Sequence, residues 1–290
     1  MKLTRILGGI FTLVLVLSLW VPAALAQTKV DVNSVPRVDP ATDLDVSTGS
    51  HNLSRTDARF VKTVPPGGTT EVCVFCHTPH FTNTDMVDAP LWNRMNSAAV
   101  FTPYDSSTMD SKPGQPGGNS MACLSCHDGT VALDALVNAP GRGLGTQLGT
   151  SLPNPSYAFP PGTVNAVFTN DPAWSLMWNF TDNGNPVAAP ALMSEFGGRV
   201  IVGTDLSNDH PVSMSYPTVA QDPAFNQPPG TPGSPRVFTN GIRTFAADKV
   251  ECGSCHEPHV GGAAWSAKGI ANKLRVSNIQ SAVCLTCHIK

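Results

Sequence analysis

The chain has 290 residues, of which 13% are charged, against roughly 25% in an ordinary soluble domain. Its 25 glycines and 26 prolines argue against a long helical bundle, and its low charge argues against a charge-driven disordered chain. A net charge of −3 argues against a broad nucleic-acid-binding surface, so we expect no nucleic-acid partner.

An export signal is predicted over residues 1–26. It has a basic start at Lys2 and Arg5, an apolar run over 6–20, and the small-residue exit Ala24-Leu25-Ala26. The apolar run is shorter than the roughly 20 residues that a membrane span needs, so cleavage is favoured over a retained anchor. We therefore expect an exported protein of the periplasm or the cell surface, with no transmembrane segment in its mature form.

The eight cysteines follow one pattern. They fall into four pairs with two residues between the members, and a histidine directly follows each pair. Such motifs are typical of c-type haem attachment. The two thiols reach the two vinyl groups on one haem edge, and the following histidine offers its imidazole to the iron. The motifs are Cys73-Val-Phe-Cys76-His77, Cys123-Leu-Ser-Cys126-His127, Cys252-Gly-Ser-Cys255-His256 and Cys284-Leu-Thr-Cys287-His288.

Paired cysteines also occur in zinc knuckles and in redox proteins. Zinc knuckles use two cysteines and two histidines, or four cysteines. Thioredoxin-like redox pairs use the same Cys-x-x-Cys spacing, although no βαβ pattern surrounds these pairs. Neither alternative explains a histidine directly after every pair. We therefore predict four covalently attached haem c groups, with iron as the metal.

Each iron needs a sixth ligand or an open position. The histidines outside the motifs equal the predicted haems in number; they are His51, His80, His210 and His259. We predict that all four irons have two histidine ligands. A methionine could replace histidine at one iron, although ordinary packing is the preferred interpretation of the methionine side chains. The candidates are Met86, Met95, Met109, Met121, Met177, Met193 and Met214.

Two of the spare histidines lie very close to a motif. His80 follows His77 by three residues, and His259 follows His256 by three. Three extended residues span only about 10 Å, so such a segment cannot pass around a porphyrin edge to the opposite face of the same iron. Each of these histidines is therefore expected to serve a neighbouring haem, with the two irons on the order of 10 Å apart.

The order of the ligands repeats along the chain. Each half supplies one upstream histidine, one motif with a trailing histidine, and one plain motif, which indicates two copies of a two-haem module. Pairing within modules is the simplest hypothesis, and an exchange between modules satisfies the same counts. The pairs within modules are His51 with His77, His80 with His127, His210 with His256, and His259 with His288.

The predicted fold class is a multihaem cytochrome c, mostly irregular chain with short helices and a few short strands around four closely packed haems. Helical turns are expected over 130–138 and 263–273, and a strand over 198–202. The expected organisation is a signal peptide (1–26), an extended arm (27–50), a first two-haem module (51–138), a Pro- and Gly-rich haem-free insert (139–204) and a second two-haem module (205–290).

Three segments resemble the multihaem c-type cytochromes with the doubled CXXCH motif, which occur in metal-reducing and other anaerobic respiratory bacteria. The segments are Cys-Val-Phe-Cys-His-Thr-Pro-His (73–80), Cys-Leu-Ser-Cys-His-Asp-Gly-Thr (123–130) and Ser-Asn-Asp-His-Pro-Val-Ser (207–213). The resemblance implies a role in anaerobic respiration or extracellular electron transfer. Some tetrahaem and hexahaem relatives polymerise into filaments in which one haem takes its distal histidine from the next subunit, so the resemblance also implies a homo-oligomer as an alternative.

The ligand count predicts the function. Irons with two histidines have no open position for nitrite, hydroxylamine, oxygen or peroxide. We therefore predict electron transfer without enzyme activity, toward redox partner proteins or extracellular electron acceptors. Two alternatives stay open: a small multihaem reductase, in which His51 is the first candidate to leave its iron five-coordinate, and a self-assembling subunit of a conductive filament. Asp128 and Glu257, beside the motifs, are expected to be solvated.

Overall fold

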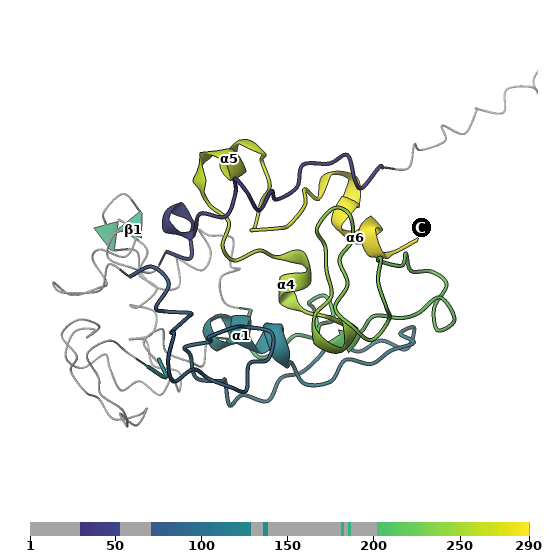
Figure 1. Ribbon diagram of the computed structural model, residues 1–290. Helices are drawn as coiled ribbons and strands as arrows, with labels where there is room; N and C mark the ends of the chain where they lie inside the picture. Colours follow the sequence, from purple (N-terminus) through teal and green to yellow (C-terminus); the bar gives the residue numbers. More distant parts are fainter. Residues whose placement is uncertain are drawn as a thin grey trace, which may run out of the picture. The chain divides into compact units, whose positions relative to one another are not determined.

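The computed structural model describes residues 30–52, 71–128, 136–138 and 202–289, and the backbone of 181–182 and 185–186 (Figure 1). The chain divides into one unit up to Asp31 and a second unit from Val32 to Lys290, and the description below concerns the second. The predicted signal peptide, most of the haem-free insert, residues 130–135 and residues 198–201 lie outside the described residues.

Regular elements within the described residues are short. The strands pair antiparallel in twos, with Thr181 opposite Pro186 and Met214 opposite Val250. None of the described helices is long and apolar enough to cross a membrane. The helices are η1 (Val46–Thr48), α1 (Gly118–His127), η2 (Ala246–Asp248), α4 (Cys252–Cys255), α5 (Gly262–Ala267), η3 (Ile279–Ser281) and α6 (Ala282–Cys287). The strands are β1 (Thr181–Asp182), β2 (Asn185–Pro186), β3 (Met214–Ser215) and β4 (Lys249–Val250).

The helical turn expected over 263–273 forms in its first half only. Helix α5 ends at Ala267, and Gly269 follows it with a φ of +65°. Asn272 and Lys273 also have left-handed backbone conformations, with φ of 54° at each. A right-handed helix cannot continue through such residues, so the chain turns here and runs back toward α4.

The cysteine motifs adopt helical turns. In the first, third and fourth motifs the histidine N–H donates to the carbonyl of the first cysteine, at 2.8, 3.1 and 2.9 Å. The second motif lies inside α1. This i to i+4 bond is the α-helical pattern, and residues three apart in a helix share one face. The two thiols of each motif are therefore carried on the same side of a turn.

A short return segment lies against the first motif. Asn93 donates its backbone N–H to the carbonyl of Cys76 at 2.8 Å, and Thr78 donates to the carbonyl of Leu91 at 2.9 Å. His77 pairs with Trp92 in an isolated antiparallel bridge. Leu91 has a φ of 58°, an uncommon conformation for a bulky residue. These bonds fix the backbone on both sides of His77.

The third motif has an equivalent return segment. Arg275 donates its backbone N–H to the carbonyl of Cys255 at 2.7 Å, and Glu257 donates to the carbonyl of Lys273 at 2.8 Å. His256 forms a bridge with Leu274. Lys273 takes the left-handed conformation that Leu91 takes in the first half. The same local structure therefore surrounds the first motif of each predicted module.

Helices α1 and α4 pack together and join the two modules (Figure 1). The Ser120 hydroxyl donates to the buried Glu251 carboxylate and accepts from the backbone N–H of Cys252 at 3.0 Å. Asn119 accepts from the N–H of Gly253 at 2.8 Å. These bonds satisfy N–H groups at the start of α4 that have no partner within the helix.

The arm at 32–52 packs along the second module. Val38 donates to the carbonyl of Arg275 at 2.7 Å, and Gly261 donates to the carbonyl of Asp43 at 3.0 Å. The Asp43 carboxylate is fully buried and forms an ion pair with Lys268 at 2.5 Å. The arm, predicted to be extended, is thus held by backbone bonds and a buried charge up to the position of His51.

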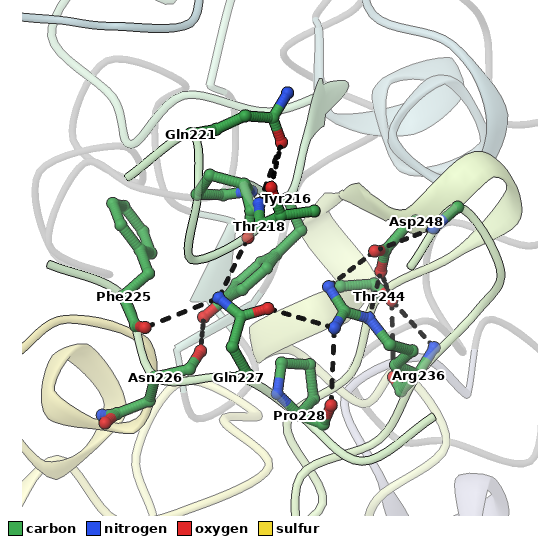
Figure 2. Close-up of polar contacts among 12 residues, drawn as sticks. Tyr216, Thr218, Gln221, Phe225, Asn226, Gln227, Pro228, Arg236, Thr244 and Asp248 are labelled. Carbon is green, nitrogen blue, oxygen red and sulfur yellow. Dashed lines mark hydrogen bonds and ion pairs between the residues drawn. The ribbon is translucent and has the colours of Figure 1, made fainter. Parts of the chain in front are cut away.

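Many of the buried side chains in the described part of the protein are polar or charged. Apolar side chains form only small clusters, such as Phe101 with Leu124 and Leu206. Figure 2 shows a polar network in which Arg236 and Asp248 form an almost fully buried ion pair at 2.6 Å. Thr244 donates to Asp248 at 2.6 Å. Removal of either partner would leave an uncompensated charge in the interior, which is strongly destabilising.

Candidate metal centres

Histidines from distant parts of the chain lie in pairs. Three pairs are in ring contact, and each joins one motif histidine to one spare histidine. Among the described residues no group of three or more His, Cys, Asp or Glu side chains is arranged to hold a metal ion. The distances between ring centroids are 6.0 Å for His51–His127, 6.1 Å for His77–His259 and 6.4 Å for His210–His288.

These separations fit two imidazoles on opposite sides of one iron. A ligating imidazole nitrogen lies about 2 Å from a transition metal, and the ring centroid lies about 1 Å beyond that nitrogen, so two opposed rings have centroids about 6 Å apart. Ordinary contact between rings covers about 4.5 to 7 Å and would allow any combination of partners. The observed combination of motif with spare histidine in all three pairs is the one that axial ligation requires.

The hydrogen bonds of the rings also suit metal binding. In five of the histidines the Nδ1 atom lies within hydrogen-bond distance of an oxygen of the chain, which leaves Nε2 for a metal. Such a bond fixes the ring orientation and the tautomer of a metal-ligating histidine. The contacts are His51 to Pro258 O at 2.9 Å, His77 to Pro90 O at 2.7 Å, His210 to Pro211 O at 2.9 Å, His256 to Asn272 O at 2.8 Å and His259 to Glu257 Oε1 at 2.8 Å.

The protonation states agree with this geometry. Burial, together with the charges of Lys273 and His127, lowers the pKa of His51 to about 4. Burial also lowers the pKa of His77. Both rings are therefore neutral at pH 7, and the neutral imidazole is the form that binds a metal.

Glu257 is a site residue that the sequence interpretation placed wrongly. It was expected to be solvated, but it is buried, forms an ion pair with Arg275 at 2.7 Å and contacts His259 Nδ1 at 2.8 Å. Burial alone raises the pKa of Glu257, but the bonds from His259 and the charge of Arg275 outweigh it and lower the pKa to about 2. Asp128 is also buried. The sequence did offer a signal for the role of Glu257, because its carboxylate comes two residues before the spare histidine that it contacts.

The three ring contacts differ from the pairs expected within modules. His51 lies beside His127 and not beside His77, and His259 lies beside His77 and not beside His288. His210 lies beside His288. Of the three contacts, His77–His259 is the one that crosses between the predicted modules, which the packing of α1 against α4 brings together. In the reductase alternative, His51 is the first candidate for a histidine that does not bind an iron. Its contacts with His127 and with the Pro258 carbonyl argue against this.

The cysteine side chains of the four motifs differ in exposure and in their contacts. Cys73 and Cys284 are exposed, and the other six cysteines are partly covered. The Cys123 and Cys252 thiols, from different modules, are hydrogen-bonded to each other. Burial raises the pKa of Cys76 and of Cys255 to about 12. These two thiols are therefore protonated at pH 7, whereas the hydrogen bond from Cys123 lowers the pKa of Cys252.

Aromatic packing surrounds the fourth motif. The Phe225 ring lies 4.5 Å from the His288 ring, and Tyr216 packs edge-on against Phe225 at 5.6 Å. Tyr216 also hydrogen-bonds the Cys287 thiol and lies under the Arg236 guanidinium at 5.3 Å. The network of Figure 2 therefore supports this motif from one side. Of the candidate methionine ligands, Met86 is buried among apolar side chains instead.

The sequence matches no protein-family model and no curated protein.

Proposed function

We propose that the protein is an exported electron-transfer cytochrome with four c-type haems, each with two histidine ligands. The observation that carries the proposal is the set of three histidine pairs, each joining one motif histidine to one spare histidine at 6.0 to 6.4 Å between ring centroids. The proposal accounts both for a histidine directly after every cysteine pair and for the second histidine that lies beside three of these histidines.

In this proposal the eight motif cysteines bind the haems covalently, and the eight histidines hold the four irons. Each haem supplies a centre that gains and loses one electron reversibly. The chain contributes orientation and burial. His77 and His259 are each held through Nδ1 by an oxygen of the chain, so the rings need little rearrangement between redox states.

Electron transfer is favoured over catalysis because a second histidine lies opposite three of the motif histidines. The reductase alternative requires an iron with an open position. His51 was its first candidate, but His51 lies 6.0 Å from His127 and is held by Pro258. Among the described residues, His256 is the motif histidine whose ring contacts no second histidine.

The attachment sites lie close enough to join the two modules. Cys123 and Cys252 are in contact, and the helices that carry them pack together. Haems attached at these thiols would have neighbouring edges. Cys73 and Cys284, which are exposed, belong to the first and fourth motifs, so we propose that electrons enter and leave through those haems. The partners are redox proteins or extracellular electron acceptors, and assembly into a filament is the alternative.

The test is production of the full chain, with its export signal, in a host that attaches c-type haem. Intact mass then counts the haems, and low-temperature electron paramagnetic resonance (EPR) of the oxidised protein reports their spin states. We expect four haems per chain, all low-spin, and reversible reduction without turnover of nitrite or hydroxylamine. Fewer than four covalent haems would overturn the haem assignment, and a high-spin haem that reduces either substrate would favour the reductase.

A further inference from the structure

Two of the eight ligand histidines are not among the three ring pairs. We propose that His80 and His256 of the same chain form the fourth pair, so that His80 is the distal ligand of the haem attached at Cys252 and Cys255. This inference rests on the proposed function and names a ligand assignment within it. In this assignment the trailing histidine of each His-x-x-His segment serves the haem of the other segment: His80 pairs with His256, and His259 pairs with His77.

The first support is the repeat. The two modules match His51 to His210, His77 to His256, His80 to His259 and His127 to His288 in order along the chain. When each histidine of the His51–His127 pair is replaced by its match in the other module, the result is the His210–His288 pair. Both pairs are observed. Applied to the third pair, His77–His259, it gives His256–His80.

The second support is the local backbone. The return segments at 90–93 and 272–275 bond to their motifs at equivalent positions. The two His-x-x-His segments therefore begin from the same surroundings. His77 faces His259, so the two segments meet at these residues. The three-residue spacing of about 10 Å would carry His80 toward the haem attached beside His256.

The third support is that both side chains are accessible, while hydrogen bonds hold the backbone of His80 and the ring of His256. His80 and His256 are exposed. The His80 carbonyl accepts hydrogen bonds from Thr78 at 3.1 Å and Asn138 at 2.9 Å, so the backbone is anchored while the ring is uncovered. His256 Nδ1 contacts Asn272 O at 2.8 Å, which leaves Nε2 for a metal.

The test uses the holoprotein with His80→Ala and His80→Met. We expect both variants to keep four covalent haems by intact mass. In His80→Ala one of the four haems changes from low-spin to high-spin in EPR. In His80→Met one haem gains the charge-transfer band of a sulfur ligand in magnetic circular dichroism. The matched control is Phe81→Ala, which removes the neighbouring exposed ring and is expected to leave four low-spin haems.

The affected haem is identified by removing one attachment site at a time. In a Cys252→Ser/Cys255→Ser background, which carries three haems, His80→Ala should produce no further high-spin signal. In a Cys123→Ser/Cys126→Ser background it should still convert one haem. A spin change that persists without the Cys252 and Cys255 site would assign His80 to another iron and overturn the inference.

Two further outcomes are decisive. Four low-spin haems in His80→Ala would overturn the inference while leaving the proposed function intact. A wild-type protein in which one haem turns high-spin on dilution would show that a second copy supplies the ligand, and would also overturn pairing within the chain. Failure of the proposed function is separate, because it appears in the wild type as missing haems.

Discussion

His77 and His259 face each other at 6.1 Å with ring planes 16° apart, although they belong to opposite halves of the chain. The ring of His77 is oriented by the Pro90 carbonyl and that of His259 by the Glu257 carboxylate. The pair therefore joins the two predicted modules, and each ring is oriented by a group of its own half.

Removal of His259 tests this pair. We expect His259→Ala to convert one haem from low-spin to high-spin in EPR, because the imidazole opposite His77 is lost. The effect should vanish in a Cys73→Ser/Cys76→Ser background and persist in a Cys284→Ser/Cys287→Ser background. The reverse result would restore the pairing of His259 with His288 that its position in the sequence suggested.

Replacement of Glu257 tests the role of its carboxylate. A negative acceptor at His259 Nδ1 makes the ring a stronger donor to the iron and favours the ferric state. We expect Glu257→Gln to raise the reduction potential of one haem by on the order of 50 mV, since a tenfold change in a one-electron equilibrium is about 59 mV. Spectroelectrochemical titration measures it. Asp110→Asn, at an exposed site, is the control, and an equal shift there would contradict the assignment.

The buried ion pair of Figure 2 gives a stability prediction. Arg236→Met leaves the Asp248 carboxylate buried without its charge partner, so we expect the free energy of unfolding to fall by about 3–5 kcal/mol. Denaturant titration followed by circular dichroism measures the loss. Arg236→Met/Asp248→Leu should be more stable than the single variant, because the uncompensated charge is gone; an equally unstable double variant would contradict this reason.

Asp43 gives a pH dependence. Burial raises the pKa of Asp43, but the Asp39 N–H and the Lys268 charge outweigh it and lower the pKa below its usual value. A carboxyl group whose folded pKa is lowered adds stability above its unfolded pKa of about 3.9, and this is lost as the pH falls through the folded pKa. Asp43→Asn should therefore be less stable than wild type at pH 7, with a smaller difference at low pH in urea titrations. A pH-independent difference would exclude the charge as the cause.

Gly253 tests the packing of α1 against α4. A Cβ at this position would meet the Asn119 side chain and, at 2.8 Å, the Phe245 ring. We expect Gly253→Ala to destabilise the protein by about 1–3 kcal/mol through overpacking, measured by thermal unfolding. Gly117→Ala is the matched control, because a Cβ there meets nothing within 4 Å and the backbone is extended. Equal losses in both variants would rule out the contact as the reason.

The sequence alone predicts the chemistry of each motif and its limits. The spacing of Cys73, Cys76 and His77 predicts an attachment site, because it matches one haem edge. The three residues between His77 and His80 are too short for both to reach one iron, since chain reach depends only on bond geometry. The number of spare histidines equals the number of motifs. None of these properties depends on which segments meet in the folded protein.

Only the tertiary structure decides which histidines meet. His51 is held at Pro258 of the second module and lies beside His127 in α1, and His259 lies beside His77 of the other half. The Ser120–Glu251 bond, the burial of Glu257 and the Cys123–Cys252 contact likewise join segments far apart in the chain. Spacing does not determine such contacts, because they depend on how buried polar groups from both halves satisfy one another.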